Sequence, residues 1–162
     1  MTLDRFAAVD RLPAGVGAPT PLGSLTPAVS GGALMLAGKG AAGTEFPFGA
    51  NVGSLVIFDI DAEHTVGSVE TLLPLDAWEQ TDESLAPPGH TEAGSLRIEG
   101  PAITLEAPDA EPRFLVNGDE GRLLIEFDTP GADTEWIRLS DRCHALIDSG
   151  SLAGLAVRLA RD

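Results

Sequence analysis

From residue 95 onward, short stretches of alternating apolar and polar residues are separated by turn-forming residues. Alternation with a period of two is typical of a strand with one buried face, and Asn117-Gly118 between two such stretches favours a hairpin turn. Turn signals every 8–12 residues or so indicate an antiparallel sheet, sandwich or roll. The strands predicted here cover residues 96–99, 103–106, 113–116, 122–127, 134–139 and 155–159.

The first half of the chain carries fewer such signals. Short apolar runs at residues 33–37 and 55–60 predict strands buried on both faces, and a further strand is expected at 66–73. Residues 13–32 are rich in Pro, Gly, Ala and Ser, which favours an extended arm or surface loop. Residues 84–94 contain Pro87-Pro88-Gly89 and are expected to form a second loop.

Two segments favour short helices. One covers residues 75–81, and the other covers 141–149, with Ser140 as the N-cap and Gly150 after the last turn. A strand at 143–148 is the alternative for the second segment. Residues 53–85 and 121–152 share a weak pattern of two strands and a helical stretch, which suggests a duplicated unit. We expect one β-rich domain over 1–162, mainly an antiparallel sandwich or roll/barrel with one or two short helices; an α+β fold is the alternative.

The formal net charge is −15, and residues 59–162 carry all of it, with 22 acidic residues against 7 arginines. Such a surface repels nucleic acid and anionic lipids, so neither is an expected partner. The single cysteine, Cys143, cannot form an internal disulfide, and no apolar run is long enough for a membrane span. With no signal-peptide pattern at the start, we expect a cytoplasmic protein, and nine arginines to one lysine indicate a bacterial genome rich in GC.

Gly38, Gly40 and Gly43 match the G-x-G-x-x-G pattern of dinucleotide-binding loops. That pattern binds pyrophosphate through the N-terminus of a helix that follows the glycines. Pro47 and Gly49 break any such helix here, so a hairpin loop is the better interpretation and no nucleotide cofactor is expected.

The segment between Asp59 and Glu70 resembles a calcium loop in its spacing. Asp59, Asp61, Glu63 and Glu70 stand at positions 1, 3, 5 and 12, where such loops carry oxygen ligands. However, His64 occupies the position that requires glycine, and the flanks predict strands. A β-hairpin with a polar turn is the alternative interpretation. Besides this possible Ca²⁺ site no cofactor is expected, because the three histidines and Cys143 lack the spacing of metal ligands.

No motif in the chain specifies a reaction, so we expect a non-catalytic module that binds or regulates another protein. The acidic charge favours a basic protein partner, and the candidate contacts are Asp59, Asp61, Glu63, Glu70, Asp119 and Glu120. The alternative is a small-molecule-binding β-barrel or enzyme with a carboxylate-lined pocket. A third hypothesis is a calcium-binding hairpin.

Overall fold

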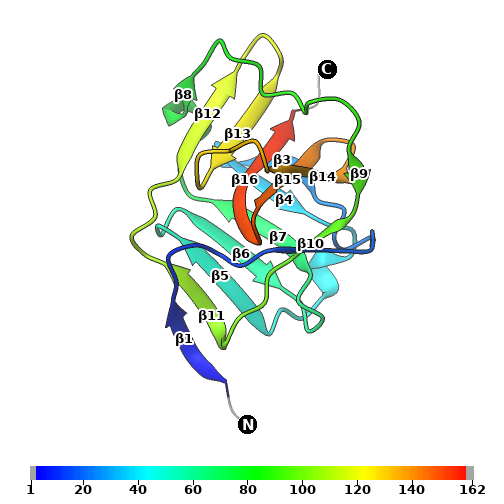
Figure 1. The fold of residues 1–162 in the computed structure, drawn as a ribbon, viewed down its shortest axis with the longest axis vertical. Coiled ribbons are helices and arrows are strands. Elements are labelled where there is room, and N and C mark those ends of the chain that lie inside the picture. The colour runs from blue at the N-terminus through cyan, green and yellow to red at the C-terminus, as the bar shows by residue number, and fades with distance from the viewer. Residues whose placement is uncertain (1–2, 160–162) are drawn as a thin grey trace.

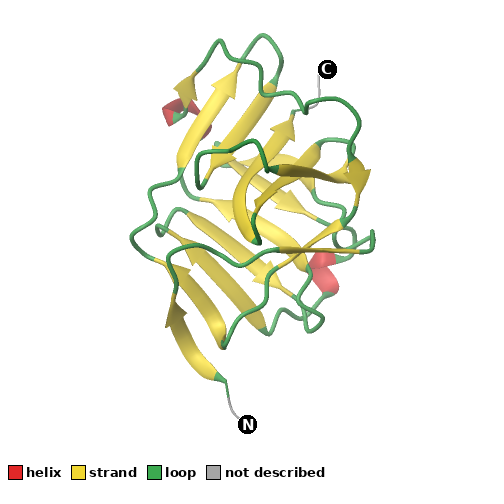
Figure 2. Cartoon of the chain, in the orientation of Figure 1, coloured by secondary structure: helices red, strands yellow, loops and turns green. Residues whose placement is uncertain are grey.

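The computed structural model describes residues 3–159, which fold into two stacked seven-stranded sheets with little helix (Figures 1 and 2). Sheet A has the order β1 (Asp4–Ala8), β11 (Ala102–Ala107), β5 (Phe48–Val52), β6 (Val56–Ile60), β7 (Val66–Thr71), β4 (Ala33–Ala37), β3 (Thr26–Ser30). Sheet B has the order β8 (Glu79–Gln80), β12 (Arg113–Asn117), β13 (Arg122–Glu126), β16 (Ser151–Arg158), β15 (Cys143–Asp148), β14 (Glu135–Ser140), β9 (Glu92–Ala93). A two-stranded ribbon pairs β2 (Gly15–Gly17) with β10 (Ser95–Arg97), and two 3-10 turns are η1 (Ala41–Gly43) and η2 (Leu75–Ala77).

The two sheets contain the same five-strand arrangement. In sheet A, the β3–β4 hairpin lies beside the β5–β6–β7 meander, with β4 next to β7. In sheet B, the β12–β13 hairpin lies beside the β14–β15–β16 meander, with β13 next to β16. Each meander is also joined by a parallel strand, β11 on β5 and β9 on β14. Each sheet is therefore a Greek key, and the repeated unit runs over β3 to β7 and β12 to β16. These units differ in extent from the 53–85 and 121–152 segments compared above.

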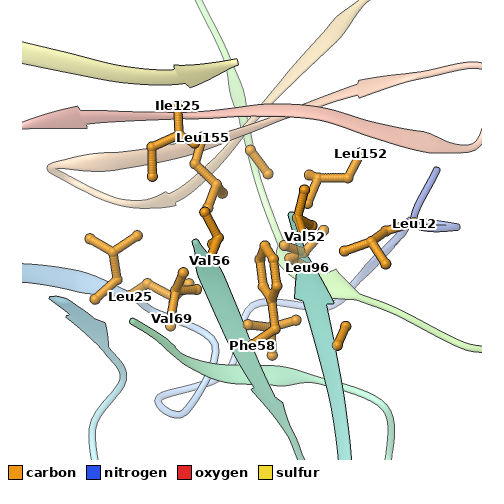
Figure 3. Packing of buried hydrophobic residues seen from close by; sticks show 14 of the residues in the cluster. Leu12, Leu25, Val52, Val56, Phe58, Val69, Leu96, Ile125, Leu152 and Leu155 are labelled. Atoms are coloured by element: carbon orange, nitrogen blue, oxygen red, sulfur yellow. The ribbon is translucent and has the colours of Figure 1, made fainter. Parts of the chain in front are cut away.

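Apolar side chains from both sheets fill the space between them. Val56 and Phe58 of sheet A meet Ile125 and Leu155 of sheet B, and Figure 3 shows them pointing toward one another. All four side chains are fully buried. Burying one such side chain contributes roughly 1.5–3 kcal/mol, so this contact between the sheets stabilises the sandwich.

The β-rich class expected from the sequence is confirmed, and most of the predicted strands are present. The β6 strand differs from expectation in its burial: Val56, Phe58 and Ile60 are buried, while Ile57 and Asp59 face outward and are partly exposed. A sandwich sheet has one face on the core and one on solvent, so the apolar run is only half buried. Within 13–32 the structure forms β2 and the edge strand β3, and within 84–94 it forms β9.

The helix predicted at 141–149 is wrong: this segment is the β14–β15 turn followed by β15. Cys143, Ala145 and Ile147 point into the core, and β15 pairs with β14 on one side and β16 on the other. Gly150, with φ of 80°, closes the β15–β16 hairpin and ends no helix. Ser and Gly serve turns as well as helix ends, so the local signals were ambiguous and the position inside the sheet decided the outcome. The helix expected at 75–81 is reduced to the single turn η2.

Gly38 and Gly40 have structural roles in the loop between β4 and β5. The Gly38 N–H donates to the Gly67 carbonyl at 3.0 Å, and a Cβ at Gly38 would collide with the Leu22 carbonyl. Gly40 has φ of 83°, which glycine adopts without strain. After Gly43 the chain enters β5, so the glycine motif belongs to a packed loop between strands.

We predict that Gly38→Ala lowers the free energy of unfolding by about 2 kcal/mol, because the added methyl forces backbone apart in a packed loop. Gly43→Ala is the matched control, since nothing lies within 4 Å of a Cβ there, and its effect is expected within about 0.5 kcal/mol. Urea unfolding of both variants measures the difference. Equal stabilities would show that the loop moves freely around Gly38.

Candidate functional site

The outer face of sheet B carries side chains that the sandwich core does not use. Because Phe114, Leu123 and Ile125 point into the core, their neighbours along β12 and β13 point outward. The strand register places these outward residues in rows across the sheet. One row contains Leu115, Leu124, Ala156, His144 and Arg138, and the next contains Arg113, Glu126, Gly154, Leu146 and Trp136.

This outer face holds a second apolar cluster. Leu115, Leu124 and Leu146 are at most 7% exposed although they lie outside the sandwich core. They are covered in part by Leu85, which belongs to residues 81–91 between β8 and β9. Since β8 and β9 lie at opposite edges of sheet B, residues 81–91 cross the whole outer face, and we call this segment the strap. The green trace in Figure 1 follows it from β8 to β9.

Side-chain hydrogen bonds attach the strap at both ends. At the β12–β13 turn, Glu120 accepts from the Ser84 hydroxyl at 2.6 Å and from the Leu85 N–H at 2.7 Å. Asn117 donates to the Glu83 carbonyl at 2.9 Å, and its own oxygen accepts from the Glu120 N–H. The hydrogen bonds from Ser84 and then from Leu85, together with the charge of Arg122, lower the pKa of the Glu120 carboxyl below its ordinary value. The carboxylate therefore acts as a structural acceptor.

At the far end, Thr91 holds the strap to β14 and β15. Its hydroxyl lies 3.1 Å from Nε2 of His144, and its carbonyl accepts from the Arg138 guanidinium at 3.2 Å. His144 is 8% exposed and packs edge-on against Trp136 at 6.1 Å between ring centroids. Burial, and then the charges of Arg138 and Arg122, lower the pKa of His144. The imidazole is therefore neutral near pH 7.

A groove of about 480 Å³ lies on the same face between the strap and residues 129–130. Its floor is apolar, formed by Leu115, Leu124, Leu146 and the half-buried Trp136. The charged residues along it are Glu83, Glu126 and Arg113. Arg113 is already paired, with Glu79 at 2.7 Å and with Glu126 at 3.6 Å. The groove thus combines an apolar floor with a rim of net acidic charge.

The six acidic residues predicted as partner contacts lie on two different sheets. Asp59 and Glu70 are on β6 and β7 of sheet A, with Asp61 and Glu63 in the turn between them. Asp119 and Glu120 belong to the β12–β13 turn of sheet B, where Glu120 holds the strap. No local sequence pattern predicts the strap contacts, because Glu120 and Ser84 are 36 residues apart.

In the predicted calcium loop, two carboxylates have protein partners. Oδ1 of Asp61 accepts from the backbone N–H groups of Glu63 and Thr65, which closes the turn, and Asp59 accepts from the Ser68 hydroxyl at 3.1 Å. His64 adopts φ of 68° at the position where a calcium loop has glycine. Within residues 3–159, no group of three or more His, Cys, Asp or Glu side chains is arranged to hold a metal ion.

Cys143 and His144 point to opposite faces of β15. Cys143 is fully buried in the core, and this burial raises its pKa to about 12. Its thiol therefore stays protonated and packs as a small apolar side chain. The other histidines lie elsewhere: His64 stacks on Phe48 at 4.7 Å, and His90 is exposed in the strap.

No family model matches the chain, and no curated protein matches its sequence. Across the described residues, no helix is both long and apolar enough to cross a membrane.

We predict that Glu120→Gln loosens the strap, measured as faster hydrogen exchange of the Leu85 amide at pH 7. Because folding lowers the pKa of Glu120, its contribution is fully present above the ordinary value of 4.5 and is lost as the pH falls through the folded pKa. Native Leu85 should therefore lose protection in acid, while the variant changes less. Glu111→Gln, at an exposed site, is the control. Equal protection in native protein and Glu120→Gln at pH 7 would contradict this role.

The calcium-loop hypothesis predicts that the melting temperature rises in millimolar Ca²⁺ relative to chelator, because a ligand that binds the folded state stabilises it. Glu70→Gln should abolish the rise, since a calcium loop needs a carboxylate at its last position. Identical melting curves with calcium and chelator would remove this hypothesis.

Proposed function

We propose that the chain is a non-catalytic binding module whose outer groove on sheet B docks a basic segment of another protein. The observation that carries this proposal is the combination of an apolar floor with an acidic rim on a sheet face that sandwiches normally leave polar.

The apolar floor supplies the affinity in this proposal. Among residues 3–159, Trp136 is the half-buried member of the second apolar cluster, and Leu124 and Leu146 belong to the same cluster. A large apolar side chain of the partner would cover Trp136 and remove its remaining exposed surface from water. Tryptophan is among the residues that most often dominate the energy of interfaces.

The rim supplies the preference for a cation. Glu83 and Glu126 line the groove with Arg113, and Arg113 pairs at 2.7 Å with Glu79, which lies outside the groove lining. The carboxylates at the rim therefore outnumber the guanidinium group. The overall charge of −15 adds a long-range field that draws basic proteins toward the surface. In this proposal the partner contacts Glu83 and Glu126 and none of the six acidic residues expected from the sequence.

A small organic ligand is the second candidate for the same groove. The volume of about 480 Å³ lies in the range that small-molecule sites occupy, roughly 300–1,000 Å³. This candidate differs from the barrel interior expected above, because apolar side chains fill the space between the sheets. Its groove would take an apolar molecule without a requirement for positive charge.

Two synthetic peptides distinguish these candidates: one alternates leucine with arginine, and the other alternates leucine with glutamate. We expect the arginine peptide to bind and to change the fluorescence of Trp136, with an affinity that falls as salt rises. The glutamate peptide should bind at least tenfold more weakly, a difference of about 1.4 kcal/mol.

Trp136→Ala should lower the affinity for the arginine peptide by tenfold or more. A buried aromatic anchor is expected to contribute about 2 kcal/mol to binding. Binding to this variant is followed by calorimetry, because the fluorescent probe is lost. Leu72→Ala is the matched control, since Leu72 is also exposed but follows β7 of sheet A. Equal binding of both peptides, or unchanged binding to Trp136→Ala, would reject the docking of a basic segment in this groove.

A further inference from the structure

Four of the nine arginines lie together at one end of the outer face of sheet B. Arg122 on β13 stands directly opposite Arg158 on β16. The Arg158 N–H donates to the Arg142 carbonyl at 2.8 Å, which places Arg142 beside it, and Arg138 stands opposite His144 on β15. We call Arg122, Arg138, Arg142 and Arg158 the arginine cluster.

The arginine cluster lacks the ion pairs that other arginines make. Arg11, Arg97 and Arg113 each form a salt bridge at 2.7–2.9 Å, whereas within residues 3–159 no salt bridge involves a member of the cluster. The nearby Glu120 carboxylate has its oxygens engaged by Ser84 and Leu85, although its charge acts on Arg122. Like charges directly opposite on neighbouring strands destabilise a sheet. Although the chain has 25 acidic residues, the four positive charges of the cluster are available to an external anion.

Arg122 and Arg138 both lie near the buried imidazole of His144. Ala156 stands opposite both Leu124 on β13 and His144 on β15, two residues before Arg158, which faces Arg122. The charge of Arg122 acts on the imidazole of His144. Arg138 acts on His144 from the other side. Thr91, which contacts Nε2 of His144 from the strap, is uncharged, and its neighbours His90 and Glu92 are exposed. Two guanidinium groups therefore approach one buried imidazole.

We propose that the arginine cluster binds a phosphate group, held by the guanidinium groups of Arg122, Arg138 and Arg158. The N–H groups of a guanidinium match the spacing of phosphate oxygens. Three guanidinium groups also complement the charge of a phosphate dianion better than the charge of a single carboxylate ligand. The site goes beyond the proposed docking of a basic segment, because none of the four arginines lines the groove. The failure of one proposal therefore leaves the other intact.

Calorimetric titration of the full chain with inorganic phosphate, in about 0.1 M salt to screen distant acids, is the first test. We expect saturable binding that weakens about tenfold for each of Arg122→Gln and Arg158→Gln. Arg97→Gln is the matched control, because it removes the same charge from an ion pair on β10. Absence of saturable binding, or equal binding by the Arg122→Gln/Arg158→Gln double variant, would overturn the proposal.

His144 provides a second readout, and sulfate serves as the probe because it stays dianionic through the pH range. A bound anion offsets the positive charges of Arg122 and Arg138, so the pKa of His144 should rise on adding sulfate, followed by NMR of the imidazole. By linkage, sulfate should bind more tightly as the pH falls through that pKa. A pKa that stays unchanged at saturating sulfate would contradict a site between these groups.

Binding of a phosphoserine peptide and of a nucleoside monophosphate, each compared with inorganic phosphate, shows which class of molecule carries the bound phosphate group. Tighter binding of either one than of inorganic phosphate, lost in the Arg122→Gln/Arg158→Gln double variant, supports the proposal and names the class of ligand. Binding of either one that is unaffected in the double variant contradicts it.

Discussion

The packing of apolar side chains between sheet A and sheet B fixes the positions of the other features of the molecule. Phe58 and Val56 on one sheet and Ile125 and Leu155 on the other are removed from water together. Successive side chains along a strand point to opposite faces of the sheet, so the residues that face the core determine which residues face outward. Burial of the inner residues therefore also places the apolar floor of the groove and the arginine cluster on the outer face.

The strap has two structural roles on sheet B. It covers Leu115, Leu124 and Leu146, which would otherwise expose an apolar patch on the outer face. The short strands that flank the strap, β8 and β9, pair in parallel with β12 and β14 at the edges of sheet B. Exposed edge strands invite association with other chains, and short added strands limit that risk. Glu120 joins these roles, because its carboxylate ties the strap to the turn between β12 and β13.

Charge is separated on the outer face of sheet B. Glutamates line the groove, and arginines gather at the end of the sheet where Arg122 and Arg158 stand opposite each other. The strand register creates this separation, because it places residues from β13 and β16 side by side although they are far apart in the chain. Charge along the chain predicted only that residues 59–162 are strongly acidic. The folded molecule offers two chemically distinct regions, and each supports its own proposal.

The β class and most strands of the second half could be predicted from the amino-acid sequence, because alternation and turn residues are local properties. It missed β5, where Gly49 and Asn51 interrupt the apolar pattern, and it favoured a helix at β15, where Ser140 and Gly150 suit either structure. Of the candidate site, it singled out Glu120 for its charge, but neither the strap, the groove nor the arginine cluster. These features arise from contacts between residues distant in sequence, such as Glu120 with Ser84 and Arg122 with Arg158. They could not be predicted from local patterns, because the packing of the two sheets selects which face of each strand is buried and which residues become neighbours.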